Sequence, residues 1–146
     1  MGIVSVACAQ GAVFIPSGGQ IFSHPADTVS IFSNVINEGS FGSSPGAVVN
    51  FSGQDWQNNA LTAALPGSNA ADSASGGLFR FTGSQKQSLS AGYNVSAGTG
   101  PSFPNLSVEN KAGVYLQDLN DLHIRGSLHF GNGYLYLNGW NTRVDG

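Results

Sequence analysis

Residues 105–146 read NLSVENKAGVYLQDLNDLHIRGSLHFGNGYLYLNGWNTRVDG, and the pattern of apolar residues in this stretch decides the fold. Pairs of apolar residues, each pair with one residue between its members, recur among turn-forming Gly, Asn and Asp. The pairs are Leu106/Val108, Val114/Leu116, Leu122/Ile124, Leu128/Phe130, Leu135/Leu137 and, more weakly, Thr142/Val144. Because side chains alternate between the two sides of a strand, each pair predicts one short strand with both members facing the same way.

The spacing of these pairs predicts a repeat of three strands. Successive pairs begin 8, 8, 6, 7 and 7 residues apart, so three strands occupy 22, then 21, then 20 residues. Such short strands do not form a stable sheet of hairpins, but stacked coils let each strand pair with its copy one coil further on. We therefore predict an all-β parallel solenoid, like a right-handed β-helix, with about 20–22 residues per coil.

The first half of the chain carries a looser version of this period. Its apolar strand positions are Val13/Ile15, Ile21, Val29/Ile31, Val35, Phe41 and Val49/Phe51, and equivalent positions again lie 20–22 residues apart. The alternative fold is an antiparallel β-sandwich, which has turns about every 8–12 residues. Residues 54–77 and 92–104 are rich in turn-forming residues and are predicted to be loops.

The composition excludes several classes of partner. Charged residues make up 9% of the chain, against about 25% in an ordinary soluble domain. Lys and Arg total 5 and the acids 8, so no basic surface is expected that would bind nucleic acid or an anionic membrane. No stretch reaches the roughly 20 apolar residues of a membrane-spanning helix.

The amino terminus predicts export. Residues 1–9 form a short apolar run ending in Ala7-Cys8-Ala9, the small-x-small pattern that signal peptidase accepts, which would leave Gln10 as the first residue. The run has no positively charged start, so we interpret it as a signal peptide remnant ahead of one solenoid domain, residues 10–146. Lipidation of Cys8 and a plain N-terminal strand are the alternatives. Cleavage would remove the only Cys and leave no thiol.

One turn offers oxygen ligands for a metal ion. Asp118, Asn120 and Asp121 place carboxylate and amide oxygens together, which suits calcium. The simpler interpretation is a turn in which Asp and Asn side chains bond their own backbone. No cofactor is therefore predicted.

Residues suited to catalysis do not form a recognisable constellation. His24, His123 and His129 lack metal-site spacing, and the last two alternate with apolar residues as outward strand positions do. A carbohydrate-cleaving solenoid would need acids gathered in one groove. The only candidates are Asp118, Asp121, Arg125 and Arg143. For Asp121 and Arg143, a surface ion pair between neighbouring coils is the expected outcome. No Gly-x-Ser-x-Gly or Ser-x-x-Lys motif occurs. We predict no catalytic residues and no enzyme activity.

Exposed aromatic residues are the best candidates for ligand binding. Tyr134 and Tyr136 alternate with Leu135 and Leu137, so they should point outward when the leucines point inward. Together with Trp140 they form the predicted binding residues, because aromatic rings can stack on sugar rings. Trp56, Tyr93 and Tyr115 complete the aromatic candidates. The alternative is that aromatic stacking only aligns adjacent coils.

The second half of the chain resembles the large repetitive surface proteins that gliding Gram-negative bacteria export by type IX secretion. The phrase from Phe103 to Leu116, with Phe-x-Asn-Leu-x-Val-x-Asn and Gly-Val-x-Leu, is typical of them. So are Gly126–Phe130 and Asn132–Gly139, and Gly77–Gln87 is similar to their Phe-x-Phe-x-Gly-x-x-x-Gln strand. The likeness covers roughly Gly46 to Gly146.

The resemblance implies a solenoid segment of an adhesin at the cell surface, with a sorting domain far downstream. No such domain is seen in this sequence, so we interpret the chain as the front of a longer protein. The predicted function is a non-enzymatic, secreted or cell-surface, structural domain for cell adhesion. Glycans or other surface molecules are the expected partners. A carbohydrate-binding or carbohydrate-cleaving β-helix is the alternative.

Overall fold

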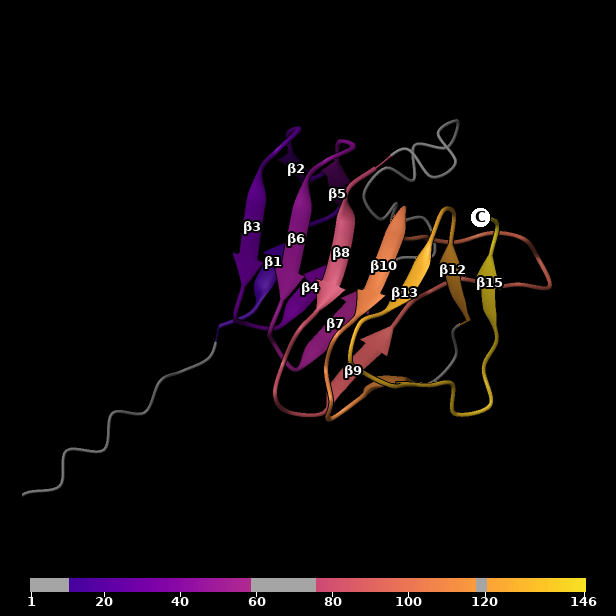
Figure 1. Ribbon diagram of the computed structural model, residues 1–146. Helices are drawn as coiled ribbons and strands as arrows, with labels where there is room; N and C mark the ends of the chain where they lie inside the picture. The colour runs from indigo at the N-terminus through magenta and orange to yellow at the C-terminus, as the bar shows by residue number, and fades with distance from the viewer. Residues whose placement is uncertain (1–10, 59–75, 118–120) are drawn as a thin grey trace, which may run out of the picture.

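The structure, a computed structural model, describes residues 11–58, 76–117 and 121–146 (Figure 1), so the predicted signal peptide remnant lies outside the described residues. These ranges contain fifteen short strands and no helix, and therefore no helix that could cross a membrane. In chain order the strands are β1 (Val13–Ile15), β2 (Gln20–Ser23), β3 (Thr28–Ile31), β4 (Val35–Asn37), β5 (Ser40–Ser43), β6 (Val48–Phe51), β7 (Asp55–Asn58), β8 (Leu78–Phe81), β9 (Gln87–Ser90), β10 (Asn105–Val108), β11 (Val114–Leu116), β12 (Leu122–Ile124), β13 (Leu128–Phe130), β14 (Leu135–Tyr136) and β15 (Thr142–Val144).

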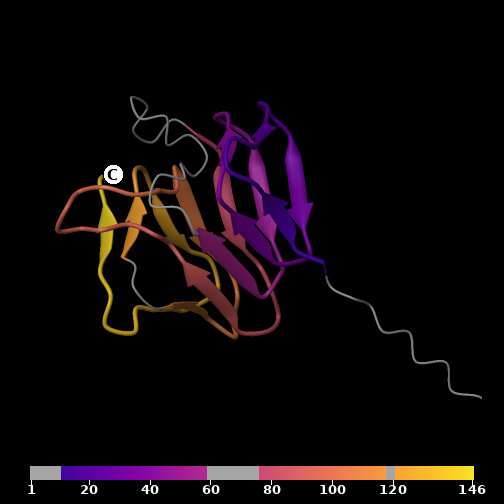
Figure 2. The same ribbon diagram turned by 180° about the vertical axis from the view of Figure 1, so that it is seen from behind.

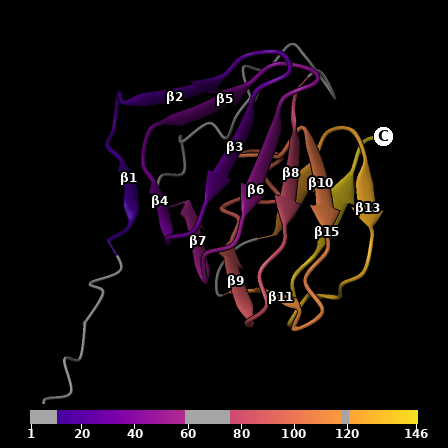
Figure 3. The same cartoon turned by 60° about the vertical axis from the view of Figure 1, so that its left-hand side comes forward.

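These strands wind into stacked coils with three faces, most easily followed in Figure 3. Face 1 is the sheet β1-β4-β7-β9-β11-β14, and face 2 is the sheet β3-β6-β8-β10-β13. Face 3 carries two separate pairs, β2 with β5 and β12 with β15. Face 2 is turned toward the viewer in Figure 1, whereas the view from behind in Figure 2 brings face 1 forward.

Every pair of described strands is parallel and joins successive coils. Leu106 pairs with Leu128, and Val114 pairs with Leu135. In the first half of the chain, Val29 pairs with Val49. These are the offsets expected from the spacing of apolar residues, so the predicted parallel solenoid and its period are confirmed, and the alternative antiparallel sandwich is wrong. On faces 1 and 2 each coil contributes one strand to the ladder, so the strands inside these two sheets are stabilised by neighbours on both sides.

Two coils in the middle of the chain are longer than the rest. On face 2, Val49 pairs with Phe79, and Phe79 pairs with Leu106, and both intervals exceed the regular period. In the sequence, the extra residues fall between a face 1 strand and the following face 2 strand. In the coil of β9 and β10, Phe103 continues face 3 through a parallel bridge with Ile124. The ladders of faces 1 and 2 thus run through both lengthened coils.

The predicted loop over residues 54–77 is wrong at its beginning. Asp55–Asn58 form β7, because alternation places Trp56 and Asn58 inside and the two other side chains toward the surface. β7 completes face 1 between β4 and β9, with Trp56 in register with Val35 and Leu89. The polar composition of this strand hid its apolar inner position. Residues 59–75 lie outside the described ranges.

An aromatic cluster fills the centre of the solenoid. Trp56 is fully buried and lies 5.2–6.0 Å, ring centroid to ring centroid, from five phenylalanine rings. Trp56 comes from face 1, and the five rings, Phe41, Phe51, Phe79, Phe81 and Phe103, come from faces 2 and 3. Aliphatic residues such as Leu106, Val114 and Leu122 continue the core beyond the cluster. Edge-to-face contacts among these rings add to the free energy gained by burying apolar surface.

Buried amide side chains link the coils at two corners of the core. Asn37 donates to Asn58 one coil further on (3.0 Å), and Asn58 donates in turn to the carbonyl of Ala91 (3.3 Å). At another corner, Gln87 donates to the carbonyls of Phe51 (3.1 Å) and Gly53 (2.8 Å). Gln87 also accepts from Asn110 Nδ2 (2.9 Å), and Asn110 is itself fully buried. Gln87 thereby satisfies the Gly53 carbonyl in the turn after β6, and it adds a second donor to the Phe51 carbonyl, which also accepts from the Thr82 N–H.

The last coil exposes residues in the inward register. Phe130 and Val144 lie one coil beyond Val108 and Ile124, which are fully buried. Their exposed fractions are nevertheless 51% and 44%, because no described coil packs on top of them. The inward direction predicted for Phe130 and Val144 is thus confirmed, but their burial would require a further coil packed on top of them.

Candidate functional site

The outer side of face 1 carries two columns of side chains along the solenoid. The first column places Asp55, Ser88, Tyr115 and Tyr136 in register on β7, β9, β11 and β14. The second column runs through Phe14, Ile36, Gln57 and Ser90, with Gln117 following β11. Polar side chains therefore occupy the middle of the face, with the tyrosines at the C-terminal side and two apolar residues at the N-terminal side.

A groove of about 290 Å³ crosses the polar part of face 1. Its lining residues are Asp55, Trp56, Gln57, Ser88, Ser90 and Gln117. The surface is hollow here because β9 presents two small serines, while the neighbouring strands present longer Asp and Gln side chains. A carboxylate, two carboxamides and two hydroxyls thus meet in one open depression.

Contacts between coils hold the walls of this groove. Asn34 donates to Asp55 Oδ2 (3.1 Å), and Asn34 Oδ1 accepts from the backbone N–H groups of Gln54 and Asp55 (both 3.1 Å). On the other side, Gln117 Nε2 lies 3.4 Å from Ser88 Oγ. The groove therefore rests on paired strands rather than on a loop.

The tyrosines beside the groove form a stack. The rings of Tyr115 and Tyr136 are nearly parallel, with an interplanar angle of 8° and centroids 4.2 Å apart. Lys86 Nζ lies 4.2 Å from the centroid of the Tyr115 ring, in a cation–π contact. A hydrogen bond with the Tyr115 side chain raises the pKa of Tyr136. Gly113, at φ +92°, lies beneath both rings, and a Cβ there would come within 2.6 Å of the Tyr136 ring.

Tyr134 and Tyr136 point outward, as predicted, with exposed fractions of 62% and 42%. Trp140 does not share this exposure: it is half-buried and packs against the core. The proposed surface role of Trp56 is wrong, because its ring fills the core and is 0% exposed. Tyr93 is also buried, at 3%. Tyr115 and Tyr136 cover each other's ring faces, so this pair aligns adjacent coils by stacking. Tyr134 has the more exposed ring of the two outward tyrosines on this segment.

Asp121 is the one predicted calcium ligand that the structure describes, since Asp118 and Asn120 lie outside the described ranges. Asp121 Oδ1 accepts from the backbone N–H (2.8 Å) and side-chain Nδ2 (3.0 Å) of Asn141. Its Oδ2 accepts from the backbone N–H of Val95 (3.1 Å). Although burial raises the pKa of Asp121, these hydrogen bonds together hold it below its usual value. Over the described residues, no three His, Cys, Asp or Glu side chains come together.

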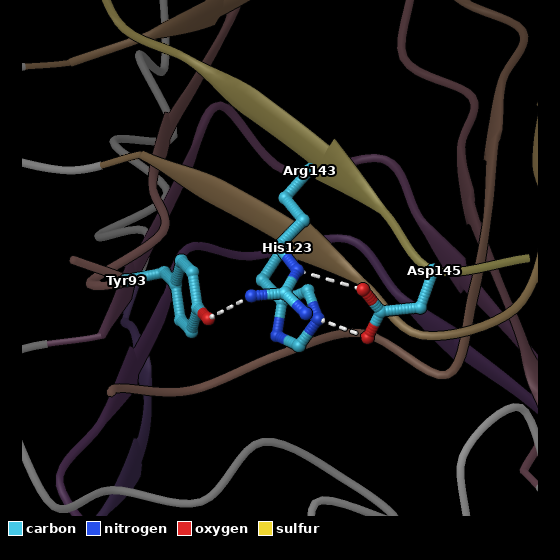
Figure 4. Close-up of polar contacts among 4 residues, drawn as sticks. All are labelled: Tyr93, His123, Arg143 and Asp145. Atoms are coloured by element: carbon cyan, nitrogen blue, oxygen red, sulfur yellow. Dashed lines mark hydrogen bonds and ion pairs between the residues drawn. The ribbon is translucent and has the colours of Figure 1, made fainter. Parts of the chain in front are cut away.

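Four polar residues meet on the outer side of face 3 (Figure 4). His123 Nε2 and Arg143 Nε each lie 2.7 Å from an oxygen of Asp145, on Oδ2 and Oδ1 respectively. Arg143 also donates to the Tyr93 hydroxyl (3.4 Å), and the Tyr93 and His123 rings lie 4.4 Å apart. The expected ion pair between Asp121 and Arg143 is wrong, because the register of β12 and β15 puts Arg143 beside His123.

The remaining histidines are dispersed. His24 is exposed next to the Phe22 ring, 5.0 Å away, and His129 is exposed on face 2. The outward direction predicted for His123 and His129 is confirmed, although His123 is largely covered by its partners, with only 12% of its side chain exposed.

Acid should weaken the attachment of the last coil through Asp145. Hydrogen bonds from His123 and then Arg143 lower the pKa of Asp145 below 3.8. A carboxylate with a lowered pKa stabilises the folded state above the pKa of the unfolded chain, and this contribution is lost as pH falls through the lower folded value. We expect the urea midpoint to fall between pH 5 and pH 2.5 by less in Asp145→Asn than in the unmodified chain. Equal falls in both proteins would contradict the assignment.

No known protein-family model, curated protein or solved structure matches this chain.

Proposed function

We propose that this chain is a non-enzymatic structural and adhesive module of a secreted or cell-surface protein. The observation that carries the proposal is the distribution of acids. Five of the six acids that the structure describes take part in separate contacts within a turn or between coils. They are Asp27 with the His24 backbone, Asp55 with Asn34, Glu109 with Arg80, Asp121 with Asn141 and Val95, and Asp145 with His123 and Arg143.

This distribution favours a scaffold over a hydrolase. Glycoside hydrolysis requires two carboxyl groups on opposite sides of one bond. Among the described residues that line the groove on face 1, Asp55 is the one acid. The acids strengthen contacts between coils instead, as expected of a domain that holds binding surfaces in fixed positions.

Export and the type IX route are part of the same proposal, supported by Ala7-Cys8-Ala9 and by the resemblance in the second half of the chain. The low basic content argues against nucleic acid as a partner. Mass measurement of the protein released by its native host should give a chain that begins at Gln10. An intact Met1 would contradict cleavage.

Adhesion is tested with the full chain over an immobilised outer-surface extract of a Gram-negative bacterium, beside a bare surface. We expect saturable binding to the extract and no release of new reducing ends or peptide fragments. Released fragments would contradict a non-enzymatic role, and the absence of saturable binding would contradict adhesion. The same chain, unfolded by heat beforehand, serves as the control, because non-specific adhesion of unfolded protein would persist in it.

A further inference from the structure

We propose that the groove on face 1 binds a neutral sugar residue of a surface glycan, with Asp55, Gln57 and Gln117 as its polar contacts. The inference rests on the adhesive function proposed above and names the ligand class and the site. Three observations carry it: the groove's mixture of donors and acceptors, its charge, and the rigidity of its walls.

The groove offers the hydrogen-bonding groups that a sugar needs. A sugar presents hydroxyls that both donate and accept, at close spacing around one ring. Asp55 is an acceptor, whereas the carboxamides of Gln57 and Gln117 each donate and accept. Ser88 and Ser90 add hydroxyls on the floor, where their small size leaves room for a ring.

The charge of the groove favours a neutral sugar over a uronic or sialic acid. Asp55 is the only charged residue among the lining residues. Among the described lining residues there is no Arg or Lys to pair bidentately or as a point charge with a sugar carboxylate. Lys86, just before β9, contacts the ring of Tyr115. An anionic sugar would meet the carboxylate of Asp55 without compensation.

The side chains of Asp55 and Gln117 are already held in place before a ligand arrives, and strand pairing fixes the backbone positions of Gln57 and Ser90. Asp55 is fixed by Asn34 from the preceding coil, and Gln117 contacts Ser88 across the groove. Gln57 and Ser90 stand in register on paired strands. Less side-chain ordering is therefore required on binding, which raises affinity for a given set of contacts.

The tyrosine stack extends the site toward the C-terminal end. Tyr115 is in register with Ser88 and forms the edge of the polar region, and Tyr136 follows one coil further on. Coils are spaced by about 4.8 Å along the ladder, close to the length of one sugar residue in an extended β-linked chain. A glycan lying along the first column would thus place successive sugars beside Asp55, Ser88 and the tyrosines.

The test fills the groove without altering the fold. Ser90→Trp places a large ring on the groove floor, while Ser30→Trp makes the same change at an exposed outward position of β3 on face 2. Asp55→Ala removes the single carboxylate. Thermal unfolding of each variant confirms that it is folded before binding is measured.

Binding is measured by affinity electrophoresis with neutral laminarin, dextran and mannan and with anionic alginate. We expect at least one neutral polymer to retard the full chain and alginate not to do so. Ser90→Trp and Asp55→Ala should each weaken that binding at least tenfold, and Ser30→Trp should leave it unchanged. Retardation by alginate alone, no retardation by any polymer, or equal binding by Ser90→Trp would overturn the proposal.

The bacterial extract separates this proposal from the adhesive function. The extract is also treated with periodate to oxidise its sugars. If saturable binding persists both in Ser90→Trp and with the oxidised extract, the proposed glycan site is wrong, but the adhesive function is still supported. If the unmodified chain does not bind the extract at all, the adhesive function itself fails.

Discussion

Trp56→Ala will lower the free energy of unfolding by about 3–5 kcal/mol, the usual loss when a buried Trp or Phe is truncated to alanine. The loss should lie at the upper end of this range because the ring, on face 1, contacts five phenylalanines from the other two faces. Collapse of one face into the cavity would pull its strand out of register with both neighbouring coils. Urea unfolding followed by far-UV circular dichroism measures the change.

Trp140→Ala is the matched control for this prediction. Trp140 belongs to the last coil, is half-buried, and contacts the core from one side. We expect a loss well below that of Trp56→Ala. The Trp56→Phe variant should lose less than Trp56→Ala, because it keeps an aromatic ring and removes an indole N–H without a hydrogen-bond partner. Similar losses for Trp56→Ala and Trp140→Ala would mean that the aromatic cluster is not the centre of stability.

Gln87→Leu should lower the free energy of unfolding by about 1–3 kcal/mol, although it puts an apolar residue of similar size into the core. The substitution leaves the carbonyl of Gly53 without its donor, whereas the carbonyl of Phe51 still accepts from the Thr82 N–H and Asn110 Nδ2 still donates to the carbonyl of Gln85. Each buried polar group left unsatisfied costs about 1–3 kcal/mol. Chemical denaturation gives the total, and amide hydrogen exchange at β6, β9 and β11 should locate the effect.

Gln85→Leu is the matched control for Gln87→Leu. Gln85 belongs to the same turn and is exposed, so its substitution should change stability by no more than about 0.5 kcal/mol. If Gln87→Leu proved as stable as Gln85→Leu, apolar packing rather than the amide contacts would be what holds this corner of the solenoid together.

The period of the fold could be predicted from sequence because inward positions have one property in common. Leu106, Val114, Leu122 and their equivalents alternate with polar residues and recur once per coil, so both strand direction and coil length follow. The strand of residues 55–58 could not be predicted in this way. Its inward residues are Trp56 and Asn58, and the buried amide of Asn58 is stable only because Asn37 and Ala91 supply partners from other coils.

The groove could not be predicted from the sequence for a related reason. Its residues come from the lengthened coils on face 1, where Trp56 pairs with Leu89 and Leu89 with Leu116. The regular period that the apolar pairs indicate would not align Gln57 with Ser90. The outward direction of Tyr134 and Tyr136 could be predicted because they alternate with Leu135 and Leu137. Polar residues on an outward column have no such pattern, and only the pairing of strands brings them together.

The lengthened coil of β9 and β10 shows where this architecture accepts additional residues. The ladders of faces 1 and 2 continue without interruption past the long segment between β9 and β10. A foreign peptide epitope grafted into this segment would need no anchor of its own, and it would cost little more than the modest entropy of closing a larger loop. The groove on face 1 should keep its geometry in such a graft.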